Sequence, residues 1–109
     1  MLSMELKVIE MNQNEAIENV KNLIEELFRT YTIMPDSDNK SKLGYIIVML
    51  KRQLSLKMIL NQISKYINDV VSVSYNDKTK RESDRKFWNY ILNIFISHIP
   101  SSKKYIDND

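Results

Sequence analysis

The feature that most constrains this chain is the spacing of its apolar residues, which recur every three or four positions in four separate stretches. This spacing places apolar side chains along one side of a helix that turns every 3.6 residues. The four stripes are Ala16, Ile17, Val20, Leu23, Ile24, Leu27, Phe28 and Tyr31; Leu43, Ile46, Ile47, Leu50 and Leu54; Ile59, Leu60, Ile63, Tyr66, Ile67, Val70 and Val71; and Phe87, Trp88, Ile91, Ile94, Phe95 and Ile99. No stretch alternates as a strand does, so the helices have only one another to pack against. The sequence therefore predicts an all-α fold, a four-helix bundle.

Composition limits the domain organisation and the class of protein. The 109 residues suffice for one hydrophobic core, so we expect a single domain over residues 1–109. Charged residues make up 28% and hydrophobic residues 43%, which is typical of a soluble globular protein. The chain has no cysteine, which excludes disulfides and thiolate sites and fits a reducing compartment.

The net charge of +2 conceals a difference between the two halves of the chain. Residues 1–39 carry three basic and eight acidic residues, a net charge of −5. Residues 40–109 carry thirteen basic and six acidic residues, a net charge of +7. The second half therefore presents the basic surface of the protein.

The chain has no segment expected to cross or enter a membrane. Its longest apolar run, from Tyr45 to Leu50, is far shorter than the roughly 20 residues of a spanning helix. Residues 1–11 contain Glu5, Lys7 and Glu10, which interrupt the apolar core that a secretion signal needs. We expect a cytosolic protein in which residues 1–11 form an N-terminal extension, because Met4 and Met11 are alternative starts.

Capping residues predict where the first three helices begin. Asn12 with Glu15 resembles a capping box, so the first helix should begin near Gln13, and Pro35 prevents its continuation. The polar residues 36–39 offer caps for a second helix that should run to about Gln53. Ser55 can cap the third. This last connection is so short that the second and third helices are either nearly continuous or antiparallel neighbours.

The last helix follows the clearest turn of the chain, residues 75–78. Thr79 with Glu82, or Ser83 or Asp84 alone, can begin this helix, and Pro100 ends it. Residues 100–109 should form a polar C-terminal tail that is loose at its end.

Catalytic and metal-binding patterns are weak in this sequence. The one histidine, His98, lies in the last turn of the fourth helix, where an imidazolium suits the negative helix end, and we interpret it as structural. Residues 36–40 begin like a calcium loop but lack its glycine and its distant glutamate. The acidic residues of the first helix lack the Glu-x-x-His pairs of a di-metal bundle; they are Glu15, Glu18, Glu25 and Glu26. We therefore expect no enzymatic activity, no cofactor and no metal.

Basic residues cluster at the start of the fourth helix. They are Lys78, Lys80, Arg81, Arg85 and Lys86, and Lys51, Arg52, Lys57 and Lys65 lie elsewhere in the same half. Such a cluster favours either nucleic-acid binding or a solvated basic end. The small net charge, and the position of Phe87 and Trp88 on the core stripe, favour the solvated end.

Some apolar residues lie outside the core stripes and need a cover. They are Tyr45, Val48 and Met49 on the second helix, and Leu92 and Ile96 on the fourth. The N-terminal segment, with Met4, Leu6, Val8 and Ile9, or a wide core can supply this cover. The functional alternatives are a partner protein, a homodimer or a membrane-protein surface.

One segment carries a resemblance to a known family. The residues Leu60-Asn61-Gln62-Ile63-Ser64-Lys65-Tyr66-Ile67 are similar to the third helix of the enterocin-like branch of the pediocin-like (class IIa) bacteriocin immunity proteins. In that helix an aliphatic residue, Asn, a second aliphatic residue, Tyr and a third aliphatic residue recur at this spacing. The order of elements over residues 13–99 also fits, whereas the N-terminal extension and the short tail depart from the family.

The resemblance implies an antiparallel four-helix bundle in the cytosol that has no enzymatic activity and protects a producer cell from its own peptide. Members of the family are thought to act at the membrane-embedded components of the mannose phosphotransferase system when bacteriocin is bound there. In that family the C-terminal half determines which bacteriocin is countered. On this chain, the turn before the fourth helix and the tail would form one recognition end, with the partner-binding positions Lys78, Lys80, Arg81, Arg85, Lys86, Lys103, Lys104 and Tyr105.

Overall fold

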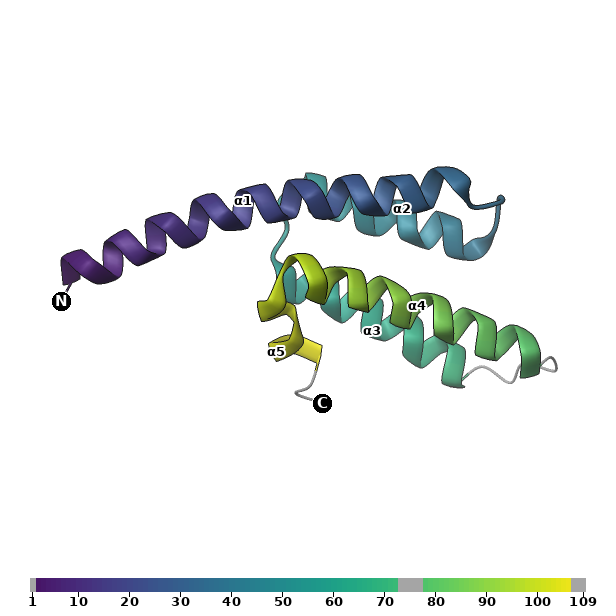
Figure 1. Cartoon of the computed structure of the whole chain (residues 1–109). Helices are drawn as coiled ribbons and strands as arrows, with labels where there is room; N and C mark the ends of the chain where they lie inside the picture. Colours follow the sequence, from purple (N-terminus) through teal and green to yellow (C-terminus); the bar gives the residue numbers. More distant parts are fainter. Residues whose placement is uncertain (1, 73–77, 107–109) are drawn as a thin grey trace.

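A computed structural model describes the backbone of residues 2–72 and 78–106, and the side chains of residues 17–69 and 78–106. The elements in chain order are α1 (Leu2–Ile33), α2 (Asp38–Lys51), α3 (Leu56–Ser72), α4 (Lys78–His98), the 3-10 turn η1 (Pro100–Ser102) and the short α5 (Lys103–Ile106). The four long helices alternate in direction along the chain (Figure 1). The predicted antiparallel four-helix bundle is confirmed.

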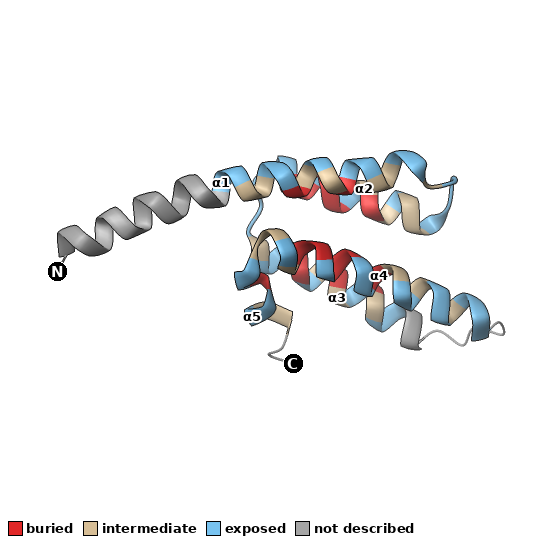
Figure 2. Cartoon of the chain, in the orientation of Figure 1, coloured by how far each residue is buried: buried red, intermediate tan, exposed pale blue. Residues whose placement is uncertain are grey.

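The core lies where the four apolar stripes meet. Helix α1 packs against α2 and α4, and α3 packs against the same two helices, so the contacts run around the whole bundle. Figure 2 shows the buried residues on the sides of the helices that face one another. Among the described residues, the fully buried apolar side chains are Leu23, Leu27, Leu43, Ile46, Ile59, Leu60, Ile63, Trp88, Ile91 and Phe95. All of them belong to the predicted stripes.

Helix α1 begins at Leu2, so the prediction of a start near Gln13 is wrong. Asn12 and Glu15 lie within the helix and do not form its cap. The physical reason is that residues 2–12 are mostly strong helix formers and include neither glycine nor proline. In Figure 1 this part of α1 continues past the ends of the other helices. The side chains of Met4, Leu6, Val8 and Ile9, which we expected to cover the bundle, lie outside the described residues.

Helix α2 begins and ends with defined caps. The Ser37 hydroxyl accepts a hydrogen bond from the backbone N–H of Lys40 at 3.2 Å, as the polar linker predicts. At the other end, the N–H groups of Gln53 and Leu54 donate to the carbonyls of Leu50 and Met49, at 3.0 and 3.2 Å. This pair of bonds is a Schellman motif. The helix ends at Lys51, two residues before the predicted Gln53.

The connection between α2 and α3 makes the two helices antiparallel neighbours, not one kinked helix (Figure 1). The Ser55 hydroxyl accepts a hydrogen bond from the N–H of Met58 at 3.2 Å, so the predicted cap of α3 is confirmed. Gln53 takes a φ of 60°, in the left-handed region that glycine prefers. The reversal therefore depends on a strained residue.

The only glycine has a packing role within α2. A Cβ atom at Gly44 would lie 3.1 Å from the Tyr31 ring, closer than such atoms normally approach. The absence of a side chain lets the ring of Tyr31, from α1, lie directly on the α2 backbone. Lys40 then lies over the same ring, 4.9 Å from its centre.

The last helix and the tail differ in part from the sequence prediction. Helix α4 begins at Lys78, before all three of the predicted starts, Thr79, Ser83 and Asp84. The turn predicted at residues 75–78 lies mostly outside the described residues. The helix ends at His98, as Pro100 predicts. The first residues of the tail are ordered as η1 and α5, which pack against α3, and the side chain of Ser102 is fully buried. The end of the tail, residues 107–109, is not described.

Candidate functional site

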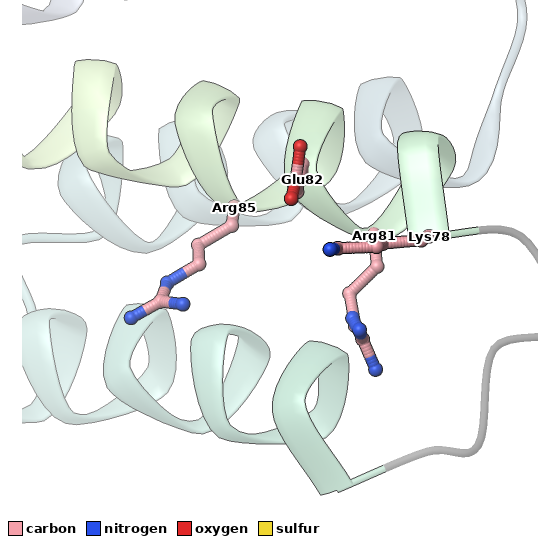
Figure 3. Close-up of a pocket in the computed structure, with 4 residues that line it drawn as sticks. All are labelled: Lys78, Arg81, Glu82 and Arg85. Carbon is pink, nitrogen blue, oxygen red and sulfur yellow. The ribbon is translucent and has the colours of Figure 1, made fainter.

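The basic residues of α4 surround a concavity of about 300 Å³ that Lys78, Arg81, Glu82 and Arg85 line. The sequence spacing i, i+3, i+4 and i+7 places these four side chains on one face of the helix. In Figure 3, Arg81 and Arg85 extend from α4 toward the neighbouring α3. We call these four residues the basic concavity.

The charge of the basic concavity is poorly compensated. Of the four described residues that line it, three are cationic and Glu82 is the one carboxylate. Among the described residues, no acidic group lies within ion-pair distance of Lys78, Arg81 or Arg85. The site therefore keeps a positive potential that is available to an anion.

Helix α4 also reverses the usual distribution of charge along a helix. Acidic residues normally occupy the positive N-terminal end, as Asp38 does in α2, but the first turn of α4 contains no acidic residue. It contains Lys78, Lys80 and Arg81 instead. Each cation there costs about 0.3–1 kcal/mol of helix stability, and like charges four residues apart, such as Arg81 and Arg85, cost a few tenths more. The fold therefore carries this cluster at the expense of stability.

A polar clamp fixes α4 beside the basic concavity. The side-chain amide of Asn39, at the start of α2, donates to an oxygen of Asp84 at 2.9 Å. Its carbonyl oxygen accepts a hydrogen bond from the indole N–H of Trp88 at 3.2 Å. Trp88 is fully buried, so this bond satisfies a donor that water does not reach. Sequence reasoning had placed Asn39 and Asp84 only as helix caps.

The tail residues do not join the basic concavity. Lys103 and Lys104 are exposed, and Tyr105 is half-buried against the core with the Lys104 ammonium 6.0 Å from its ring centre. They follow the C-terminal end of α4, whereas the concavity is at the N-terminal end (Figure 1). The 21 residues of α4 separate the two by about 30 Å. The prediction of one recognition end that combines the turn and the tail is therefore wrong.

The remaining basic positions of α4 do not line the basic concavity. Lys80 and Lys86 are both exposed. The helical period places Lys80 on the other side of the helix from Lys78, Arg81 and Arg85, whereas Lys86 lies one turn beyond Glu82, at the border of the same face. The structure thus brings together three of the eight predicted partner-binding residues.

The apolar residues outside the stripes divide into two groups. Met49 and Leu92 are buried and Ile96 is half-buried, so a wide core accounts for them. Tyr45 and Val48 are exposed, to 53% and 43%. Phe28, which the stripe placed in the core, is 47% exposed and stacks on Tyr31.

His98 connects two helices. Its Nε2 contacts the carboxylate of Glu26, so the end of α4 is held against α1. A histidine in such a contact stabilises the packing of the two helices, as the structural interpretation expects. Within the described part of the chain, no group of three or more His, Asp or Glu side chains is placed to hold a metal ion.

Two further findings concern the protein beyond this site. Within residues 2–72 and 78–106, no helix has the length and the hydropathy needed to cross a bilayer. No family model, no curated protein and no solved structure matches this sequence.

Proposed function

We propose that this protein is a bacteriocin immunity protein: a cytosolic, non-enzymatic binding protein that protects its producer cell from a pediocin-like peptide. The observation that carries the proposal is the position of the segment Leu60–Ile67 in α3 of an antiparallel four-helix bundle. The resemblance to the enterocin-like immunity proteins depends on this segment and on the order of the helices. Its aliphatic residues and Tyr66 face the core, while Asn61 is exposed.

The partner proposed from this resemblance is the membrane-embedded part of the mannose phosphotransferase system with bacteriocin bound. The basic concavity supports the proposal, because a cluster of cations gains about 1 kcal/mol for each Lys or Arg close to an anionic membrane surface. In this proposal the protein associates peripherally with the inner face of the membrane. Electrostatic attraction brings it there, and exposed side chains such as Tyr45 and Val48 then provide specific contacts.

The experiment that tests this function is the survival of a bacteriocin-sensitive strain that produces the protein. We expect survival in the presence of at least one peptide from a panel of pediocin-like bacteriocins, and no change toward unrelated pore-forming peptides. The double variant Lys103→Gln/Lys104→Gln tests whether the tail contributes as well. Failure to protect against every peptide of the panel would contradict the proposal.

A second function, nucleic-acid binding, is favoured by the same basic concavity. Binding to duplex DNA through phosphate contacts releases counterions, so the affinity falls steeply with salt, and more steeply the more phosphates are contacted. The concavity supplies three cations on one helix face. A gel-shift titration at several salt concentrations tests this alternative, which requires a shift that weakens steeply as salt increases.

A further inference from the structure

We propose that the basic concavity of α4 binds a phosphate group, carried either by an anionic lipid headgroup or by a small soluble phosphate compound. The lipid source rests on the proposed function, whereas phosphate binding itself does not. The geometry is the first argument: Lys78, Arg81 and Arg85 project from one face of α4 around a concavity of about 300 Å³. A volume of this size accommodates a phosphate group with part of the molecule that carries it.

The charges around the concavity provide the second argument. Arg81 and Arg85 are separated by one helical turn, so their side chains, which extend in different directions in Figure 3, can rotate to bring both guanidinium groups to oxygens of the same phosphate. Lys78 adds an ammonium group on the same face. No described acidic residue pairs with any of the three, so an arriving anion has no carboxylate ion pair to displace.

The third argument is the position of the cluster on the helix. The N-terminal end of a helix already favours an anion, and the cations of the first turn add to that potential. In the unliganded protein the same cations repel the helix dipole, which destabilises α4. A bound phosphate removes this repulsion, so binding should stabilise the protein.

The polar clamp gives the concavity a fixed geometry. Asp84 lies between Arg81 and Arg85 in sequence, and its hydrogen bond to Asn39 attaches this turn of α4 to the start of α2. Trp88, one turn further along, is held by the same amide. The helix that carries the cations is thus restrained at two successive turns before a ligand arrives, which lowers the entropy cost of binding.

The test uses the full-length protein and two double variants that each remove two positive charges. Arg81→Gln/Arg85→Gln removes the guanidinium groups of the concavity. Arg52→Gln/Lys57→Gln is the matched control, because both residues are exposed at the connection between α2 and α3, at the opposite end of the bundle. The 17 residues of α3 between the two ends of the bundle span about 25 Å, which is more than two Debye lengths of about 8 Å each at physiological salt.

Two probes distinguish the sources of the phosphate. The first is inorganic phosphate, titrated against sodium chloride of the same ionic strength while thermal unfolding is followed. The second is sedimentation with vesicles of phosphatidylglycerol in phosphatidylcholine, compared with phosphatidylcholine alone. We expect phosphate to raise the midpoint of unfolding of the wild type and of the control, and not that of the Arg81/Arg85 variant. We expect that variant to bind anionic vesicles about 30-fold more weakly, as the loss of two cations near the surface implies.

The outcomes separate the possible explanations. Binding of both probes supports a lipid headgroup, and binding of inorganic phosphate without vesicles supports a soluble phosphate compound. An equal loss of binding in the two double variants would overturn the proposal, because the overall positive charge would then explain the binding. The absence of binding by the wild type would overturn it as well. If duplex DNA bound through the same arginines more tightly than phosphate or anionic vesicles do, nucleic-acid recognition would replace the proposal of a phosphate site. If the protein bound phosphate but did not protect cells, the proposed phosphate site would stand and the proposed immunity function would be rejected.

Discussion

At the scale of single residues, the Asn39 amide is the side chain whose loss should matter most outside the apolar core. Replacing Asn39 with Ala leaves the buried indole N–H of Trp88 without an acceptor and removes the partner of Asp84. A buried donor without a partner costs about 1–3 kcal/mol. Urea denaturation should show this loss in the free energy of unfolding, whereas Asn61→Ala, at an exposed position of α3, should change it by less than about 0.5 kcal/mol. Equal effects of the two variants would mean that the clamp contributes nothing.

Tyr66 should give the protein a measurable sensitivity to alkaline pH. Burial is the largest influence on its hydroxyl and raises its pKa above the ordinary value of 10.0, against the lowering effects of Gln62 and Lys42. The unfolded chain therefore loses this proton at lower pH than the native protein does. The contribution of Tyr66 to the free energy of unfolding is therefore fully present below pH 10, and it is lost as the pH rises through the raised pKa of the native state.

The variant Tyr66→Phe isolates this contribution. Between pH 9 and pH 11.5, the wild type should lose more free energy of unfolding than Tyr66→Phe does, each measured against its own value at pH 8. Tyr90→Phe serves as the control, because Tyr90 is 51% exposed. A wild type and a Tyr66→Phe variant with the same pH dependence would show that Tyr66 is not buried in solution.

At the scale of the helical elements, the C-terminal end of α2 has a residue that does not suit its conformation. Gln53 adopts a φ of 60° in the Schellman motif, where glycine is the preferred residue. Gln53→Gly should therefore raise the free energy of unfolding by about 0.5–1 kcal/mol, since it removes the strain of a side chain in the left-handed region. Thermal unfolding measures the change, and a lower midpoint would contradict this description of the turn.

The helices also show which features of the fold could be predicted from the sequence and which could not. The three-and-four spacing placed Ile63, Trp88 and Ile91 correctly in the core, because burial follows directly from the helical period. The start of α1 was missed, because a capping residue such as Asn12 does not end a helix whose preceding residues also favour helix. The left-handed Gln53 was missed because no glycine marks the turn.

The candidate site was predicted less completely than the fold. The cluster of cations was visible in the sequence, but Lys80 was grouped with Arg81 because sequence proximity does not state which face of the helix a residue occupies, and Lys86 does not reach the concavity. Asn39 bonds to Asp84 and Trp88, which follow it by 45 and 49 positions in the sequence, so no local sequence pattern reveals this clamp. The tail is separated from the concavity by the length of α4, and the approximate length of this helix was predicted from the sequence.

At the scale of the whole molecule, the basic concavity and the tail lie at opposite ends of the bundle. The core and the clamp hold α4 in place, and the first turns of α4 carry cations that the helix would be more stable without. Natural sequences break such local rules mainly at functional sites. This makes the start of α4, and not the tail, the end at which the protein should act.

The most direct test of this claim is the survival of bacteriocin-sensitive cells that produce either the Arg81→Gln/Arg85→Gln variant or the Arg52→Gln/Lys57→Gln variant, with equal protein levels verified in each strain. We expect the first variant to be at least as stable as the wild type yet to lose most of its protection, while the second protects fully. Full protection by the Arg81/Arg85 variant, or equal loss in both, would contradict this claim.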